Sequence, residues 1–434
     1  MDWWVAIGSL YLLPVIVVVL LYWVYHQRIT RRANDIYQES VEAGLLEPAS
    51  LHPVIDNARC LGCGTCVSAC PENQVLGLIN NRAKLIKPAS CIGHGACKTA
   101  CPNQAIQLVF GTATRGVDIP LVEADFQTNV GGIYIAGELG GMGLIRNAIE
   151  QGRQAVESIA GNGRCGQSGQ LDIVIVGAGP AGISAAMYAS EMGLSYRVLE
   201  QDSVGGTIAH YPRGKVVMTA PARLPIIGEF HFGETSKEDL MNFWSNAVNQ
   251  ANLDIRTGIR VDAIEATPSG FLIQSSQACS ASNVLLAIGR RGTPRKLGVP
   301  GEEHCKVVYS MMDPQQYRGK KVIVVGGGDS ALEAAVSLSE EPGTEVLLSY
   351  RGAAFNRVKA GNRERTAAAK DSGQLTVEMG SQLARITPDQ VHIKTVLGDV
   401  KLANDAVIIC AGGILPTAFL QSVGIEVETR FGAT

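Results

Sequence analysis

The stretch LDIVIVGAGPAG, residues 171–182, contains the pattern that decides the fold. Its continuous apolar run is typical of a buried strand in a parallel sheet. The glycines that follow, Gly177, Gly179 and Gly182, have the spacing G-x-G-x-x-G and lead into the helical pattern ISAAMYASEM. Gly177 permits a tight turn, Gly179 lets backbone approach a pyrophosphate, and Gly182 lets the helix pack on the strand. We therefore expect an α/β fold with a dinucleotide at the helix N-terminus.

The residues around this loop complete a first nucleotide site. The next strand, SYRVLE, ends at Glu200, where a carboxylate can bind ribose hydroxyls. A lone glycine loop is weak evidence, but strand, glycines, helix, strand and acid in register are specific. The predicted contacts of the loop also include Pro180 and Ala181.

A second copy of this plan is KKVIVVGGGDSALEAAVSL, residues 320–338. Its second strand, TEVLLSYR, ends at Arg351 rather than at an acid, and Lys359 and Arg363 follow. Cations there suit the 2′-phosphate of NADP and leave the ribose of NAD without its usual acceptor, although a solvated basic loop is the competing interpretation. The residues predicted to bind this second nucleotide are Gly326, Gly328, Asp329, Ser330, Arg351 and Arg357.

Two cysteine runs, CLGCGTCVSACP and CIGHGACKTACP, precede the first glycine loop. The first has the spacing C-x2-C-x2-C-x3-C-P, and the second has histidine in place of one cysteine. Tight turns direct the first three side chains of such a run at one cuboidal iron–sulfur cluster, and the fourth points toward another cluster. Zinc sites usually pair one C-x2-C with a distant second pair, so zinc is a weaker interpretation.

Residues 52–108 thus resemble the two-cluster bacterial ferredoxins. The resemblance implies one 4Fe–4S cluster on Cys60, Cys63, Cys66 and Cys101, and a second cluster on Cys70, Cys91, Cys97 and the position of His94. The family has cysteine where this chain has His94, so the type of the second cluster is open. Either a ring nitrogen of His94 binds iron and raises the reduction potential, or one iron is missing and the cluster is 3Fe–4S.

Residues 171–434 resemble the thioredoxin-reductase-like flavoproteins. Besides the two glycine loops, the resemblance rests on the triplet Gly205, Gly206 and Thr207 and on NVLLAIGR, in which Gly289 closes the first flavin part. It implies FAD at the first loop and NADPH at the second. Thioredoxin reductases carry a redox C-x-x-C before the second loop, and here those places hold Tyr309 and Met312, which excludes thioredoxin reduction through a dithiol.

The family's closing segment is found in an unexpected place. The chain stops soon after the NADPH part, whereas TNVGGIYIAGELGG and the helical pattern after it, within residues 128–161, resemble the segment that returns to the flavin. Gly137 and Glu138 stand where the family has glycine and aspartate. We therefore predict a circular permutation, which domains with neighbouring termini tolerate. The competing interpretation is an independent strand–helix unit of the ferredoxin part.

Residues 3–25 contain no charge, and Trp and Tyr lie at both ends of this run. The run is long enough to cross about 30 Å of hydrocarbon as a helix. Arg28, Arg31 and Arg32 follow it. These features predict one transmembrane anchor in the cytoplasmic membrane, with the N-terminus outside and the body in the cytoplasm.

The composition fits several folded domains. The 434 residues carry a net charge of −3, which excludes the basic field of a nucleic-acid-binding protein, and 18% charged with 46% hydrophobic residues excludes disorder. We expect α/β architecture: two Rossmann-like three-layer domains, a small α+β ferredoxin domain and one transmembrane helix. The predicted segments are 3–25 (anchor), 26–56 (helix and linker), 57–110 (ferredoxin), 111–161 (permuted flavin segment), 171–292 (FAD), 293–412 (NAD(P)H) and 413–434 (return to the FAD domain).

The resemblances imply an NAD(P)H-dependent oxidoreductase that moves electrons between NADPH, FAD, two clusters and a partner. The partner would be a membrane or peripheral electron-transfer protein, such as a cytochrome, a quinone-linked subunit or a ferredoxin. The chain itself would form a homodimer or part of a larger complex. The alternative is a reductase of a small disulfide or quinone that acts directly at the flavin. His210, His231, Arg213 and Lys215 form no acid–base constellation, although Arg213 and Lys215 are placed either to stabilise reduced flavin or in a solvated loop.

Overall fold

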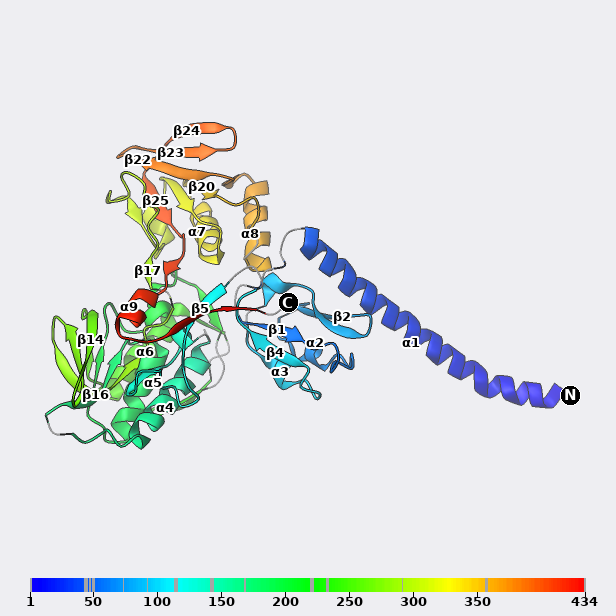
Figure 1. Cartoon of the computed structure of the whole chain (residues 1–434). Coiled ribbons are helices and arrows are strands. Elements are labelled where there is room, and N and C mark those ends of the chain that lie inside the picture. Colours follow the sequence, from blue (N-terminus) through cyan, green and yellow to red (C-terminus); the bar gives the residue numbers. More distant parts are fainter. Residues whose placement is uncertain are drawn as a thin grey trace. The chain divides into compact units, whose positions relative to one another are not determined.

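The computed structural model describes residues 2–432 except 43–45, 47, 49–50, 73, 92, 113–115, 141–143, 168, 219–221, 232–233, 291 and 356–357. The chain divides into two compact units (Figure 1). The smaller consists of residues 1–115, 354–360 and 431–434, and the larger of residues 116–353 and 361–430.

The helix α1, Asp2–Glu42, continues through the predicted anchor and the polar residues after it (Figure 1). Among the residues that the structure describes, no helix is long and apolar enough to cross a membrane. The predicted transmembrane anchor and the predicted location in the cytoplasmic membrane are therefore wrong.

The end of α1 packs on the cysteine-containing part of the smaller unit. The buried Ser40 hydroxyl donates to the carbonyl oxygen of Ile86 at 2.9 Å, and Lys84 Nζ lies 3.6 Å from the centre of the Tyr37 ring. Two antiparallel strand pairs flank the core of this unit. The first joins β1 to β4, and the second joins the consecutive strands β2 and β3. The elements are β1 His52–Ile55, α2 Thr65–Ala69, β2 Leu76–Ile79, β3 Arg82–Leu85, η1 Pro88–Ser90, α3 Ala96–Thr99 and β4 Ile106–Val109.

The first sheet of the larger unit has seven strands in the order β13-β8-β7-β16-β15-β14, with β6 paired to β16. The strands β13, β8, β7, β16 and β6 are parallel to their neighbours, whereas β14 and β15 form an antiparallel extension. Their bounds are β6 Ile133–Ile135, β7 Leu171–Val176, β8 Tyr196–Leu199, β13 Ile255–Arg256, β14 Val261–Thr267, β15 Gly270–Ser275 and β16 Cys279–Leu286.

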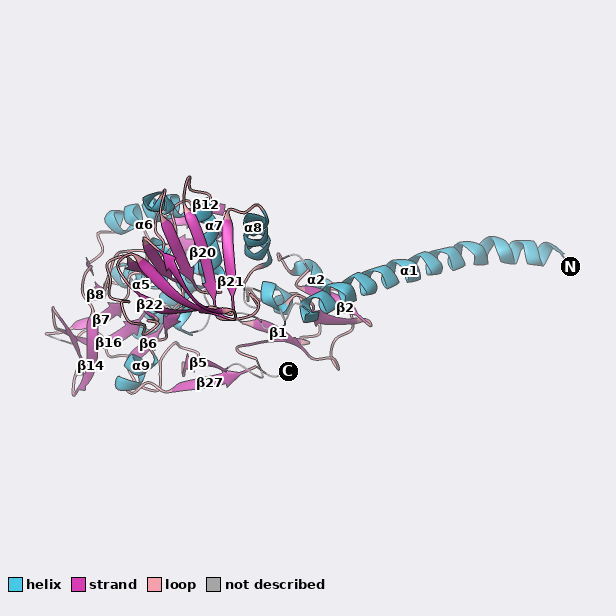
Figure 2. Ribbon diagram, turned by 90° about the horizontal axis from the view of Figure 1, so that it is seen from above, coloured by secondary structure: helices cyan, strands magenta, loops and turns pink. Residues whose placement is uncertain are grey.

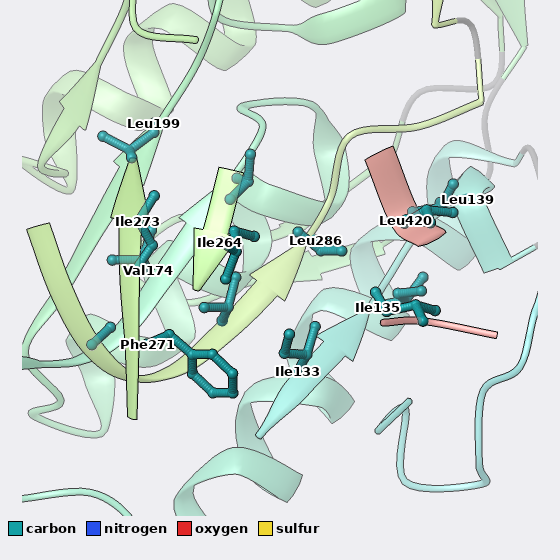
Figure 3. Close-up of a cluster of buried hydrophobic side chains, with 14 of the residues drawn as sticks. Ile133, Ile135, Leu139, Val174, Leu199, Ile264, Phe271, Ile273, Leu286 and Leu420 are labelled. Atoms are coloured by element: carbon teal, nitrogen blue, oxygen red, sulfur yellow. The ribbon is translucent and has the colours of Figure 1, made fainter. Parts of the chain in front are cut away.

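The core of this sheet joins segments that are far apart in the chain. Figure 3 shows Ile133 and Ile135 of β6 beside Leu286 of β16, with Leu420 of α9 in the same cluster. Side chains of α4 and α5 form a second buried cluster with the strands. The helices and short turns here are η2 Glu138–Gly140, α4 Ile145–Gly161, α5 Pro180–Glu191, η3 Gly206–His210, α6 Lys237–Gln250 and α9 Thr417–Ser422.

The second sheet of the larger unit is parallel, with five strands in the order β18-β25-β19-β20-β21 (Figure 2). A three-stranded antiparallel sheet, β22-β23-β24, lies next in sequence, and α7 packs on β19 and β20. The elements are β18 Val307–Val308, η4 Pro314–Tyr317, β19 Lys321–Val325, α7 Asp329–Ser339, β20 Glu345–Tyr350, α8 Ala360–Asp371, β21 Leu375–Met379, β22 Gln382–Ile386, β23 Gln390–Thr395, β24 Gly398–Ala403 and β25 Ala406–Ile409.

Short strand pairs connect these parts. The chain enters and leaves the second sheet through β17 and β26, which pair antiparallel, and β27 pairs with β5. Two further pairs, β9 with β12 and β10 with β11, lie between η3 and α6 in sequence. The bounds are β5 Gly116–Pro120, β9 Val216–Met218, β10 Ala222–Leu224, β11 Gly228–Phe230, β12 Glu234–Ser236, β17 Thr293–Pro294, β26 Gly413–Ile414 and β27 Val427–Phe431.

Candidate functional site

The first set of predicted cluster ligands lines one hollow of the smaller unit. This hollow encloses about 350 Å³, part of it open to solvent, and its cysteines are Cys60, Cys63, Cys66 and Cys101. The turn that carries the first three depends on Gly62, because a Cβ there would overlap the carbonyl oxygen of Asn81. The helix α2 then begins at Thr65 and places Cys66 in the core.

The second set lines another hollow of about 290 Å³, again partly open to solvent. Its lining includes Cys70, Cys91, His94 and Cys97, and it also includes the carboxylate residue Glu72, which the motif did not single out. The turn repeats the first one, since a Cβ at Gly93 would lie 2.6 Å from the carbonyl oxygen of Leu51. The structure thus groups the eight predicted ligands into the two sets of four that the resemblance implied.

Burial and crowding raise the pKa of cysteine thiols in both hollows. Burial, with the neighbouring Cys60 and Cys63, raises the pKa of the Cys66 thiol to about 11. Burial raises the pKa of the Cys91 thiol to about 11 as well, and the nearby Cys97 and Cys70 add to the shift. Crowded thiolates repel one another, and bound metal offsets that repulsion while releasing the protons.

Backbone N–H groups also point at the sulfur atoms. Cys60 Sγ accepts from Ala83 N at 3.4 Å, and Cys101 Sγ accepts from Ala105 N at 3.3 Å. Such bonds to cluster sulfurs are one of the means by which proteins tune reduction potentials. Within the described residues no group of three His, Cys, Asp or Glu could hold a single metal ion.

The first glycine loop has the geometry that its sequence predicts. Gly177 has φ +106°, which favours glycine, and a Cβ at Gly182 would overlap the Gly177 carbonyl oxygen because α5 packs so closely on the loop. Gly179 caps α5, Pro180 is its first residue and Ala181 its second. The helix N-terminus therefore presents its unpaired N–H groups at the end of β7.

The carboxylate of Glu200 ties the second strand to this loop. It is buried, and it accepts from the backbone N–H of Ala178 at 2.7 Å and from that of Asp202 at 2.9 Å. Gly205 and Gly206 lie against the loop, because Gly205 N donates to the carbonyl oxygen of Ala178. Thr207 follows them in η3, and Gly289 lies just beyond β16.

Gly137 and Glu138 lie at the end of β6, next to the first loop. Gly137 N donates to Gln151 Oε1 at 2.9 Å, and a Cβ at Gly137 would lie 3.1 Å from that of Ala181. Arg290, a residue that motif matching had not selected, donates to the carbonyl oxygen of Asp118 at 3.0 Å. Burial lowers the pKa of Arg290, and the charges of Glu138 and Asp118 oppose that shift. A partly buried cation near a predicted flavin contact would have been detectable only from the fold.

The second glycine loop is built in the same way. Gly326 approaches the chain so closely that a Cβ would overlap the carbonyl oxygen of Cys410, and Gly328 caps α7. Asp329 opens α7, with Ser330 after it, and Asp329 accepts from Asn362 Nδ2 at 2.8 Å. Arg351 is exposed after β20, whereas Arg357 lies outside the described residues.

The loop that contains Arg213 and Lys215 contacts the second sheet region. Lys215 Nζ lies 2.7 Å from Glu333 Oε2 of α7, and Arg213 N donates to the carbonyl oxygen of Met312 at 3.0 Å. Arg213 also lies 3.6 Å from the Asp313 carboxylate. This loop therefore connects the two dinucleotide-binding parts, a role that neither of the sequence interpretations had included.

Comparison with known proteins agrees with this geometry. Residues 174–432 match the pyridine nucleotide-disulphide oxidoreductase family, and residues 52–102 match the 4Fe-4S dicluster domain. The chain therefore belongs to the pyridine nucleotide-disulphide oxidoreductase family.

Individual relatives cover the larger part of the chain. Ferredoxin–NADP reductase of Thermus thermophilus is 30% identical over 271 residues, which are 59% of this chain and 77% of the relative. Bacilliredoxin reductase Bdr of Bacillus subtilis is 26% identical and covers 61% and 83%. The solved structure of bacillithiol disulfide reductase Bdr from Staphylococcus aureus matches with a TM-score of 0.54 at 21% identity, over 61% of this chain and 85% of that one, and shows that the fold is shared.

These matches confirm several predictions from the sequence. The chain is an enzyme, an NAD(P)H-dependent flavin oxidoreductase, and it carries a 4Fe-4S dicluster domain. The α/β fold with dinucleotide-binding domains of the thioredoxin-reductase-like type is confirmed as well.

Proposed function

We propose that the chain transfers electrons between NADPH, FAD, two iron–sulfur clusters and a protein partner such as a ferredoxin. One observation carries this proposal: the ligand-type side chains of the two cysteine runs divide into two sets of four, each around its own hollow. The family match adds the nucleotide-binding part to the same chain. The ferredoxin–NADP reductases among its relatives support a ferredoxin as the partner.

The residues at the first glycine loop fit FAD. Gly177 and Gly179 would let the backbone approach its pyrophosphate, and Glu200 would bind ribose hydroxyls with the acceptor capacity that its two backbone bonds leave. Glu138 and Gly137 would lie near the flavin. FAD, when bound, supplies the exchange between a transferred hydride and single electrons. The protein positions the cofactor and excludes competing acceptors.

The second loop would hold NADPH. The N-terminus of α7 offers N–H groups for the pyrophosphate, and Arg351 would pair with the 2′-phosphate. Arg357, outside the described residues, is assigned there on its sequence position alone.

The clusters would be held as the ferredoxin resemblance implies. Cys60, Cys63, Cys66 and Cys101 would bind a 4Fe–4S cluster in the first hollow, and Cys70, Cys91 and Cys97 would bind a cluster in the second. The direction of flow follows from the potentials, so the same chain can also pass electrons from a low-potential donor to NADP.

We also infer that residues 128–161 are the permuted closing segment of the FAD domain. Two contacts support this. The strand β6 pairs in parallel with β16, Val284 opposite Ile133. The buried Ser184 hydroxyl of α5 donates to the carbonyl oxygen of Ile149 in α4 at 2.7 Å. A strand–helix unit that belonged to the ferredoxin part would not be expected to pair with β16 in the seven-stranded sheet.

A second candidate function is direct reduction of a small disulfide at the flavin. The observation that favours it is the likeness to the bacilliredoxin reductase of Bacillus subtilis. In this second function the cysteine runs would have no role in turnover.

A double variant, Cys60→Ser with Cys63→Ser, separates the two functions. We expect NADPH to reduce the flavin at an unchanged rate while reduction of added ferredoxin falls about tenfold or more. The matched control is Cys305→Ser, which changes an exposed cysteine of the larger unit. Undiminished ferredoxin reduction by the double variant would overturn the electron-transfer proposal.

A further inference from the structure

The two cysteine runs differ at one position, and the structure shows what replaces the missing thiol. In the first run Cys63 Sγ lies 3.3 Å from Thr65 Oγ1, two residues on, and hydrogen bonding from Thr65 lowers the pKa of the Cys63 thiol. In the second run the residue two positions after His94 is Ala96, and its backbone N–H donates to His94 Nδ1 at 3.2 Å. The nitrogen Nδ1 is therefore occupied by a hydrogen bond from the same position of the turn that approaches the ligand sulfur in the other site.

This bond fixes where the imidazole carries its proton. A neutral imidazole has one nitrogen that donates and one that accepts. Because Nδ1 accepts from Ala96, the proton of His94 belongs on Nε2. Nε2 lies 3.9 Å from Cys70 Sγ, within the range of a hydrogen bond to sulfur. Iron could bind Nε2 only if this proton moved to Nδ1, where it would face the N–H of Ala96 and the hydrogen bond between them would be lost.

The surroundings of Cys70 explain why a donor is useful there. Burial raises the pKa of the Cys70 thiol, and the charge of Glu72, whose carboxylate lines the same hollow, adds to that shift for Cys70 and for Cys91. A hydrogen-bond donor beside Cys70 offsets that negative charge. Three thiolates then supply the ligands for three iron atoms, and the neutral imidazole of His94, with its proton on Nε2, supplies a hydrogen bond to one of those ligands.

We propose that His94 is not an iron ligand but a positioning residue that donates from Nε2 to the Cys70 thiolate, so that Cys70, Cys91 and Cys97 hold a three-iron 3Fe–4S cluster. The proposal rests on the proposed function, which assigns clusters to both hollows. It selects one of the two cluster types that the sequence left open, and it makes the two clusters of the chain unlike in composition.

The test uses the full chain, purified and reconstituted without oxygen in the presence of excess ferrous iron and sulfide, because air can strip iron from a four-iron cluster. We expect about seven rather than about eight iron atoms per chain. We also expect a paramagnetic signal in the oxidised protein, since an oxidised 3Fe–4S cluster is paramagnetic and an oxidised 4Fe–4S cluster of ferredoxin type is not.

Two variants complete the experiment. His94→Cys should bind the additional iron and lose the signal of the oxidised protein. His94→Leu should keep the signal and the iron content, while the potential of this cluster moves lower because a hydrogen bond to its ligand is lost. Cys63→Ser is the matched control, which should change the first cluster and leave the signal in place.

Three results would overturn the proposal: about eight iron atoms in the reconstituted wild type, a strong nitrogen coupling from an imidazole in its cluster signal, or loss of iron in His94→Leu. The absence of iron and sulfide from every variant would overturn the proposed function as well. Iron in the first hollow with none in the second would overturn the present proposal and the second cluster of the proposed function, and would leave the first cluster in place.

Discussion

At the scale of single residues, the first glycine loop is the most demanding part of the larger unit. There is no space for a Cβ at Gly182, because the carbonyl oxygen of Gly177 occupies that position. Both residues are buried, and the obstructing oxygen belongs to the backbone and not to the flexible end of a side chain. The helix α5 must therefore move away from β7 if any other residue stands at this position.

We predict that Gly182→Ala destabilises the protein by about 1–3 kcal/mol, the usual cost of overpacking, and reduces its bound flavin. Urea unfolding and the flavin absorbance of the purified protein measure the two effects. The control is Gly161→Ala at the end of α4, where a Cβ would meet nothing within 4 Å. Wild-type stability and flavin content in Gly182→Ala would show that the helix can shift without cost.

A second prediction concerns Arg351, which is exposed after β20. Arg351→Glu should lower the preference for NADPH over NADH by about tenfold, about 1.4 kcal/mol, because a carboxylate repels the 2′-phosphate and accepts from the ribose of NADH. The ratio of kcat/KM for the two nucleotides is the measurement. Lys401→Glu, an exposed substitution of the same charge change on β24, should leave that ratio unaltered. An unchanged ratio in Arg351→Glu would refute the assignment.

At the scale of elements, α4 packs closely against α5. Gly152 of α4 is buried, and a Cβ there would overlap the carbonyl oxygen of Ala181. This close crossing joins the two helices at the N-terminal turn of α5, which is the turn proposed to bind the pyrophosphate.

We predict that Gly152→Val lowers flavin content while iron content stays at its wild-type value. The added side chain would push α4 away from α5 and cost about 1–3 kcal/mol. Ala160→Val places the same side chain at an exposed position of α4 and should alter neither cofactor. Loss of iron with retention of flavin would instead favour an independent unit of the ferredoxin part.

Local features of the fold were predictable from the sequence, whereas the pairing of distant strands was not. The glycine loops and cysteine runs were predictable because each residue type there meets a local backbone requirement, as at Gly182 and Gly62. The pairing of β6 with β16 was accessible only through the family resemblance, since the two strands are about 150 residues apart.

Other features had no local signal. The bond of Arg290 to Asp118 and the buried bond of Glu200 to Ala178 depend on where the chain folds back. The length of the apolar run at the N-terminus was a local signal, but it led to the wrong prediction of an anchor.

At the scale of the whole molecule, polar contacts join the part of the larger unit that contains the seven-stranded sheet to the part that contains the five-stranded sheet. One of them joins Lys215, on the loop after η3, to Glu333 of α7 at 2.7 Å, with side chains 32% and 21% exposed. Partial burial makes this ion pair less screened than a fully exposed one. Asn362 donates to the other oxygen of Glu333, at 3.1 Å, and holds the carboxylate in place.

We predict a coupling free energy of about 1 kcal/mol between Lys215 and Glu333. It is measured in a double-mutant cycle of Lys215→Met and Glu333→Gln by urea unfolding, and it should shrink as salt is added. The same cycle on Lys321 and Glu345, a more exposed pair at 3.2 Å, should give less coupling. Equal coupling in the two cycles would mean that the link between the sheets is only a surface ion pair.

The core in Figure 3 constrains how the protein is made on the ribosome. It combines Ile133 and Ile135 with Leu420 and Ile425, so its residues are synthesised almost 300 positions apart. The apolar side chains of β6 are synthesised early, whereas their core partners Leu420 and Ile425 are synthesised near the end of translation. During that interval the nascent chain exposes a surface that invites aggregation, and chaperones would have to cover it. The cysteine runs, by contrast, are synthesised before β6.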